Sequence, residues 1–349
     1  MHLDPIQVAF PPHPHEIETV ALRVLPPPDF ADEQCVAVAR VQPLMGAILR
    51  AGHDLAEPGG FGAHRASQRD LDVSPIRSDP DARLARRWSW GLVVVVLLLY
   101  GLLRAGFGPL PQWPEYHDFA DTRVWGIVPR AGDVLTNLAI LAAGLWAGSL
   151  HRRVWVSGDE RRAYHLVVLG AVLTALGSAW YHWEPSNERL VWDRMPMAVL
   201  ATGVVSLVLA DRVGSAFGRA ALWPLGLLAA GGVALWGVSE ALGRGDLWLY
   251  LLVRIGAAIG TLALLLTRRS RHGAVVWIWA ALACDGLETA AERLDWPIWH
   301  ATGGLVSGHN LKHVLAGGVI ACIAAWLLHR RPRAGHSSTD AGDLAAQRG

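Results

Sequence analysis

The chain has almost no lysine and little charge of either sign. Of its 31 basic residues only Lys312 is a lysine, a bias typical of a GC-rich, bacterial coding sequence. Charged residues make up 17% of the chain, and the formal net charge is +1. Nucleic-acid-binding proteins carry clustered positive charge, so this balance predicts no nucleic-acid partner.

Cysteine is also scarce. The three cysteines, Cys35, Cys284 and Cys322, lie far apart and form no Cys-x-x-Cys pair. The sequence therefore predicts neither a disulfide framework nor a thiolate metal site.

The two ends of the chain lack uninterrupted apolar runs. Residues 1–82 contain "FPPHPHEIE" and "LPPPDF", in which proline and acidic residues break every apolar stretch. We expect a disordered extension here, and no secretory signal peptide, because no apolar segment follows a short basic start. The tail, residues 331–349, is expected to be disordered for the same reason.

The middle of the chain is strongly apolar. Eight segments are long enough to cross a hydrocarbon core of about 30 Å as helices, since lipid leaves no partner for an open sheet. We therefore predict an all-α polytopic membrane protein and no further protein partner. The predicted spans are 88–107, 131–150, 162–182, 190–212, 220–241, 247–267, 273–293 and 307–328.

Arginine gathers at alternate loops between these segments, which predicts the orientation. Eight spans with both termini in the cytoplasm fit this alternation, in what we expect to be a bacterial inner membrane. The arginines on the cytoplasmic side are Arg83, Arg86, Arg87, Arg152, Arg153, Arg161, Arg162, Arg212, Arg219, Arg268, Arg269, Arg271, Arg330, Arg331 and Arg333.

Polar side chains converge on the opposite face. The third span ends with Ser178 and His182, and the fourth begins near Asp193. The eighth span begins with His309 and His313. Because the third span runs outward while the fourth and eighth run inward, all five side chains are expected near the extracytoplasmic face.

The spacing of these residues favours a metal site. His309 and His313 are four residues apart, so one helix face presents both imidazoles, and His182 from another helix completes a three-histidine zinc site. Asp193 would accept a proton from water, and Ser178 would stabilise a developing oxyanion. The alternative is a set of interfacial histidines bound to water or headgroups. Ionisable residues inside spans are costly, and this favours the metal site.

The same residues carry a resemblance. "GSAWYH", "WDRMPM" and "HNLKHVLAG" resemble the Gly-Ser-x-x-x-His, Asp-x-x-Pro-Met and His-x-x-x-His elements of the alkaline ceramidases, seven-helix zinc amidases of a wider superfamily of membrane hydrolases. The resemblance covers residues 115–330. It implies a seven-helix core preceded by an extra helix and linker in residues 83–114.

The resemblance also implies an activity. His182, His309 and His313 would bind Zn2+, and the reaction would split the N-acyl amide of a ceramide-like membrane lipid into a fatty acid and a free sphingoid-type base. A hydrolase of another acyl lipid and a non-catalytic zinc-containing receptor or sensor remain alternatives. Asp193 favours a hydrolase, because a site that only holds zinc has little use for it. A transporter is disfavoured, because no inverted repeat is visible.

Animal members of the alkaline ceramidases also bind Ca2+ before the first core helix, and the resemblance would place this site at Asp121 and Asp133 here. Two other residues of that segment, Val124 and Gly126, offer no side-chain ligand. We favour instead a pairing of Asp121 with Arg123 or Arg130, with Asp133 and Asn137 capping and packing the second span.

Two further polar groups lie within predicted spans. Lys312 is expected to extend to a lipid headgroup or to meet an anionic product. Glu288 is expected either to line the cavity or support a zinc-binding histidine, or to pair with Arg254.

Overall fold

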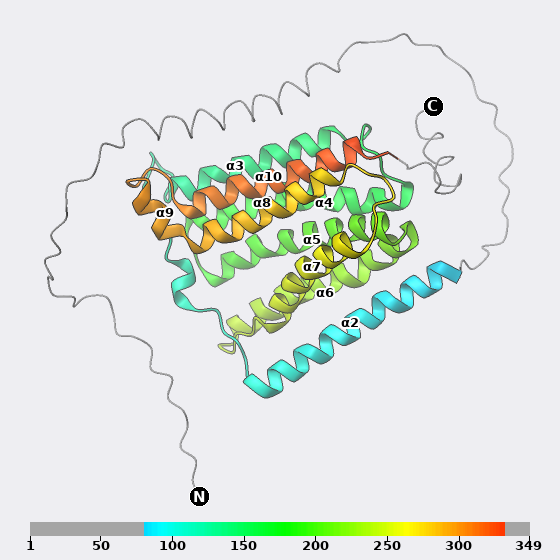
Figure 1. The fold of residues 1–349 in the computed structure, drawn as a ribbon. Helices are drawn as coiled ribbons and strands as arrows, with labels where there is room; N and C mark the ends of the chain where they lie inside the picture. The colour runs from blue at the N-terminus through cyan, green and yellow to red at the C-terminus, as the bar shows by residue number, and fades with distance from the viewer. Residues whose placement is uncertain (1–79, 332–349) are drawn as a thin grey trace, which may run out of the picture. The chain divides into compact units, whose positions relative to one another are not determined.

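The computed structural model describes residues 80–331, and within this range the chain is all-α, with no strand (Figure 1). Seven of its helices are long and apolar enough to cross a membrane, which confirms the predicted class of polytopic membrane protein. The helices are α2 (Pro80–Phe107), η1 (Pro114–His117), α3 (Ala131–Ser149), α4 (Gly158–Trp183), α5 (Asn187–Arg212), α6 (Ser215–Ala241), α7 (Trp248–Thr267), α8 (Val275–Arg293), α9 (Asp295–Ala301) and α10 (Gly308–His329).

Each of the eight predicted spans corresponds to one long helix. One of these helices, α8, is too charged to count among the seven apolar helices, because it contains Asp285, Glu288 and Glu292. It packs along α10, so it belongs to the bundle. Its crossing of the membrane stays a prediction.

The predicted disordered extension, residues 1–82, overlaps the start of α2. Its last three residues, Pro80, Asp81 and Ala82, form the first turn of α2, where Asp81 suits the positive end of the helix dipole. The rest of that extension, and the predicted tail from Pro332 onward, lie outside the described residues.

The core helices pack in a continuous series. α4 lies between α3 and α5, α6 packs on α5, and α10 lies between α3 and α8. Their shared core includes the buried side chains of Tyr164, Leu207, Ile320, Trp326 and Leu327. This arrangement brings the C-terminal end of α4 beside the N-terminal ends of α5 and α10.

The extra helix α2 lies against α6 and α7. Val93 packs on Leu228 and Leu249, while the hydroxyl of Tyr100 donates to Asp246 at 3.1 Å and Arg104 pairs with the same carboxylate at 3.0 Å. Most of its other apolar side chains are exposed, as expected for a helix that faces lipid.

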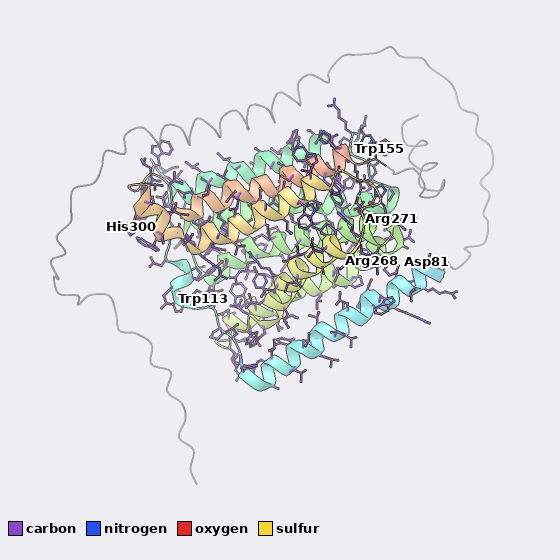
Figure 2. The ribbon with its side chains drawn as sticks, in the orientation of Figure 1. Asp81, Trp113, Trp155, Arg268, Arg271 and His300 are labelled. Atoms are coloured by element: carbon purple, nitrogen blue, oxygen red, sulfur yellow. The ribbon has the colours of Figure 1, made fainter. Side chains whose placement is uncertain are left out.

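The two ends of the bundle differ in charge. Figure 2 labels Trp155, Arg268 and Arg271 at one end and His300 at the other. The first end, here the arginine end, collects the arginine-rich loops that the sequence placed together. The second, here the histidine end, contains the last turn of α4 and the first turns of α5 and α10.

Candidate metal centre

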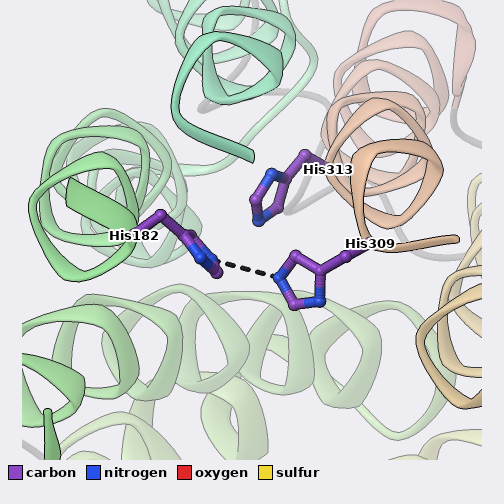
Figure 3. A group of neighbouring side chains, drawn as sticks. All are labelled: His182, His309 and His313. Atoms are coloured by element: carbon purple, nitrogen blue, oxygen red, sulfur yellow. Dashed lines mark hydrogen bonds between the residues drawn. The ribbon is translucent and has the colours of Figure 1, made fainter. Parts of the chain in front are cut away.

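Three histidines meet inside the histidine end (Figure 3). His182 comes from the last turn of α4, and His309 and His313 come from the first turns of α10. Their side chains are 1%, 3% and 2% exposed, and one ligand atom from each lies within 4.8 Å of the others. Within the described range they form the one cluster of this kind. The predicted convergence of the three histidines is therefore confirmed.

The cluster has the donor set of a metal site. The Nε2 atoms of His182 and His309 are 3.1 Å apart, close to the roughly 3.3 Å expected between two nitrogens that share a tetrahedral zinc ion. The ring of Phe119 stands edge-on to both, with centroid distances of 4.7 and 4.5 Å, and closes the cluster on one side. Three buried imidazoles fit a divalent metal, because metals such as zinc are bound by neutral imidazole nitrogen.

Thr136 of α3 orients His313, a role that the sequence did not indicate. Its hydroxyl lies 2.7 Å from the carbonyl oxygen of Gly132 and 2.9 Å from Nδ1 of His313. A hydroxyl has one proton, and the carbonyl can only accept, so the Thr136 hydroxyl donates to Gly132 and accepts from Nδ1. The lone pair of His313 is thereby fixed on Nε2, the nitrogen that a metal would need.

Ser178 and Asp193 lie beside the histidines, as predicted. The Ser178 hydroxyl is 3.5 Å from Nε2 of His313, and Asp193 is buried next to Ser178. The two helices that carry them touch here, because a Cβ at Gly177 would overlap the carbonyl oxygen of Trp192. In a regular helix the carbonyl of Trp192 would accept from the N–H of residue 196, but Pro196 has no N–H. The carbonyl oxygen can therefore turn toward α4.

The start of α10 is fixed by Asp295, which sequence reasoning missed. One carboxylate oxygen accepts from the backbone N–H of His309 at 2.7 Å, and the other accepts from the N–H of Ala120 at 2.9 Å. Ser307 and Asn310 form a capping box at the same helix end. Asp295 lies in a seven-residue helix with no periodic signal, so no pattern in the sequence pointed to it.

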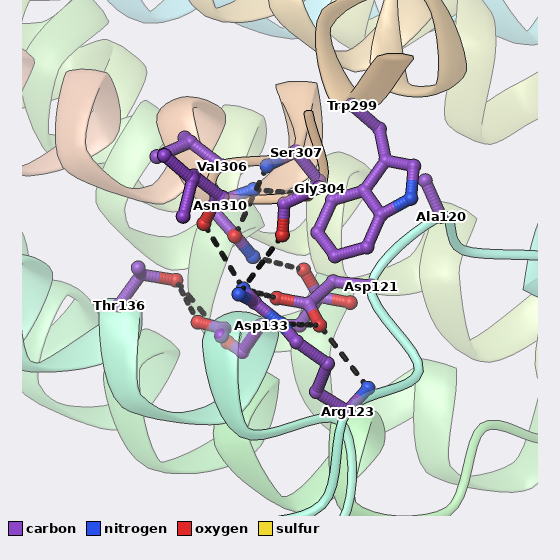
Figure 4. Close-up of polar contacts among 12 residues, drawn as sticks. Ala120, Asp121, Arg123, Asp133, Thr136, Trp299, Gly304, Val306, Ser307 and Asn310 are labelled. Carbon is purple, nitrogen blue, oxygen red and sulfur yellow. Dashed lines mark hydrogen bonds and ion pairs between the residues drawn. The ribbon is translucent and has the colours of Figure 1, made fainter. Parts of the chain in front are cut away.

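The predicted pairing of Asp121 with Arg123 is confirmed (Figure 4). The carboxylate accepts two bonds from the guanidinium, at 2.8 and 2.6 Å, and this hydrogen bonding raises the pKa of Arg123. Asp133 accepts from the amide of Asn310 at 2.6 Å and so ties α3 to α10. The capping part of the prediction is wrong, because the residue before α3 is Arg130 in a left-handed conformation without a side-chain cap.

Calcium at Asp121 and Asp133 stays a prediction. Both carboxylate oxygens of Asp121 accept hydrogen bonds from Arg123, so fewer oxygen lone pairs are available to bind a cation. Oδ2 of Asp133 and Oδ1 of Asn137 are buried without a partner, so some acceptor capacity remains.

The prediction that Lys312 extends to a headgroup is wrong. Its ammonium is buried and lies 2.6 Å from Glu292 of α8. Glu292 was missed because it lies in a different helix from Lys312, so no spacing within one helix marks the pair. Glu288 is buried in the same helix, while Arg254 donates to the hydroxyl of Tyr250 at 3.4 Å.

Comparisons of the chain with protein-family models, with curated proteins and with solved structures gave no match. The site must therefore be interpreted from its own geometry. That geometry supports a membrane protein in which three buried histidines could hold a metal ion next to a serine and an aspartate.

Proposed function

We propose that the protein is a zinc-dependent membrane hydrolase that cleaves the N-acyl amide bond of ceramide-like lipids. The products would be a fatty acid and a free base. One observation carries the proposal: three buried histidines, a serine and an aspartate meet at one end of a helix bundle whose surface suits lipid. The sequence elements that resemble alkaline ceramidases support the same activity.

Each residue has a role in this proposal. His182, His309 and His313 would hold zinc, which acts as a Lewis acid and lowers the pKa of water when bound. Asp193 would accept a proton from the attacking water and deliver it to the leaving amine nitrogen. Ser178 would donate a hydrogen bond to the amide oxygen as negative charge develops on it. Thr136 keeps the lone pair of His313 directed at the metal position.

The packing of the helices supports entry of an acyl chain from the bilayer. α7 packs on α2, α5 and α6, whereas α8 packs on α10 and α9. Helices α7 and α8 follow each other along the chain, yet they make little contact with each other. We place the entry of the acyl chain between α7 and α8, with the amide at the polar end of the bundle.

We propose the orientation from the charge of the two ends. The arginine end would face the cytoplasm of a bacterial inner membrane, with both termini, and the histidine end would face outward. Reporter fusions at the C-terminus that are active only in the cytoplasm or only outside it would test this. Activity of the outside reporter would reverse the assignment.

The experiment is a zinc measurement combined with a turnover assay. The full chain is purified in detergent, zinc per chain is measured, and fatty-acid release is followed from ceramide, other N-acyl lipids and acyl esters. His313→Ala and Asp193→Asn are compared with His300→Ala, which changes an exposed histidine of α9. We expect about one zinc per chain, lost in His313→Ala and retained in Asp193→Asn and His300→Ala.

Turnover separates the alternatives. Release of fatty acid by wild type and His300→Ala, but not by the other two variants, supports the hydrolase. Zinc without turnover on any lipid would favour a receptor or sensor instead. Absence of zinc from the purified wild type would remove the basis of the proposal.

A further inference from the structure

Arg194 directly follows Asp193 in α5. The guanidinium is surrounded by three aromatic rings: Tyr116 of η1, Trp236 of α6 and Tyr250 of α7, at 5.0, 4.4 and 4.8 Å from the ring centroids. The residue is only 5% exposed. A full positive charge is therefore buried at the histidine end of the bundle.

Part of the hydrogen-bonding capacity of this group is unused, although the hydroxyl of Tyr116 also lies within its reach. Nη2 donates to Oε1 of Gln112 at 2.8 Å, but Nε and Nη1 of Arg194 have no partner. The Nε2 of Gln112 is also buried without a partner. Arg194 donates to the oxygen of this same amide group. Nε and Nη1 of Arg194 and Nε2 of Gln112 are therefore three unpartnered donor nitrogens that lie close together.

The neighbouring carboxylates are bound by other groups. Glu240 accepts from the backbone N–H of Gln112 at 2.8 Å and from the indole of Trp236 at 3.1 Å. Glu292 pairs with Lys312, and Asp193 lies next to Ser178. Among residues 80–331, no carboxylate lies within ion-pair distance of Arg194.

An anion would complete this arrangement. Buried donors that lack acceptors cost free energy, and a buried cation is costly unless a negative group binds it. Nε and one Nη of a guanidinium form the fork that binds the two oxygens of a carboxylate. All the unpartnered atoms here are donors, so the missing partner is an acceptor, and its charge should be negative.

The position connects this site with the metal centre. The hydroxyl of Tyr116, whose ring contacts Arg194, lies 3.5 Å from Glu292. Glu292 binds Lys312, which lies between His309 and His313 in α10. Gln112 and Tyr116 both come from the linker between α2 and α3, and Phe119 of the same linker closes the histidine cluster.

We propose that Arg194 and Gln112 bind a carboxylate carried by the amine part of the lipid substrate. The reaction stays the hydrolysis of an N-acyl amide, but the substrate class changes from the ceramide-like lipid proposed above to an N-acyl amino acid or a similar N-acyl lipid with an acidic group. The inference rests on the proposed hydrolase function, because that function makes the bound group part of a substrate. The acidic group would hold the head of the lipid while its amide lies at the histidines.

The test measures binding without catalysis. Full-length protein in detergent is stripped of metal with a chelator, and binding of radiolabelled N-palmitoylglycine is measured at neutral pH. N-palmitoylglycinamide, in which a neutral carboxamide replaces the carboxylate, competes in parallel. We expect the wild type to bind the acid about tenfold or more tightly than the amide, since hydrogen bonds to charged groups are among the strong ones.

The variants assign the preference to one residue. Arg194→Gln should bind acid and amide equally, and Arg194→Lys, which keeps the charge without the fork, should retain part of the preference. Arg189→Gln is the matched control, an arginine of the same helix end that pairs with the exposed Glu184, and it should behave as the wild type. Equal binding of acid and amide by the wild type overturns the proposal, whether or not the variants fold.

Two further measurements separate the possible sources of the carboxylate and the two proposals. If palmitate is preferred over hexadecanol through Arg194, while N-palmitoylglycine shows no preference over its amide, the site binds the released fatty acid and the headgroup assignment is wrong. If zinc-loaded protein binds N-palmitoylglycine through Arg194 but hydrolyses no lipid, the anion site stands and the hydrolase proposal fails.

Discussion

The two ends of the bundle bury arginine in different ways. At the arginine end, Arg330 pairs with Glu160 at 2.8 Å and Arg212 pairs with Asp211 at 3.0 Å. At the histidine end, Arg194 has aromatic rings and one amide around it, and the histidines contact one another. The buried arginines of the first end have carboxylate partners within residues 80–331, whereas Arg194 at the second end has none there, although Lys312 nearby pairs with Glu292. This difference separates groups that hold the fold from groups that can hold a ligand.

The largest effect should come from breaking an ion pair at the arginine end. Glu160→Gln leaves the guanidinium of Arg330 buried without its carboxylate, which costs about 3–5 kcal/mol. Glutamine can still serve in the capping box with Ser157, so the loss is assigned to the pair. Thermal unfolding in detergent measures it.

The control for that variant is Glu184→Gln, which removes a pair with Arg189 on a side chain that is 74% exposed. We expect less than about 1 kcal/mol there. A similar small loss in Glu160→Gln would mean that the arginine end does not depend on its ion pairs, and the comparison between the two ends would fail.

The next effect concerns how the histidine end is held together. Gly177→Ala places a methyl group onto the backbone carbonyl of Trp192, which cannot move aside as a side chain could. We expect a loss of about 3 kcal/mol. Gly231→Ala in α6, where a Cβ meets nothing within 4 Å, should be neutral or slightly stabilising. Unchanged unfolding in Gly177→Ala would show that the contact between α4 and α5 is looser than described.

A smaller effect is expected for the residue that orients His313. Thr136→Val keeps the shape of the side chain but removes the acceptor for Nδ1, so zinc affinity should fall about tenfold to hundredfold. Competition with a chromogenic chelator measures this affinity. Thr136→Ser should restore most of it, and equal affinity in Thr136→Val would assign the threonine to packing alone.

The smallest effect concerns the cluster of Asp121 and Asp133, and it tests whether these residues only hold the fold or can also bind a ligand. Because Arg123 binds both oxygens of Asp121, added Ca2+ should shift the melting temperature of the wild type by less than about 1 °C. A larger shift that disappears in Asp121→Asn would place the cluster among the ligand-binding groups. Mg2+ at the same concentration controls for ionic strength.

The sequence was informative wherever the signal was local. Apolar runs placed seven of the eight long helices within about five residues at each end, while α2 begins eight residues before its predicted span. The i, i+4 spacing placed His309 and His313 on one face of α10. The capping residue Ser157 explains why α4 begins before its apolar run. These signals are short in range, so one sequence contains them.

The rest depended on contacts between different helices and linkers. Lys312 looked like a residue for the membrane interface until α8 brought Glu292 to it. Thr136 and Asp295 act on α10 from other elements, and no pattern within either segment marks them. Arg194 follows Asp193 directly, yet its surroundings come from η1, α6 and α7, which only the fold assembles.

The order of the helices along the chain sets when the histidine cluster can form. His182 and His309 are 127 residues apart, and α10 is the last described helix. At a synthesis rate of about 5–20 residues per second, the first histidine waits roughly 6–25 seconds for the others. A chain that stops before α10 has one of the three ligands, so metal binding reports that synthesis and assembly of the bundle are complete.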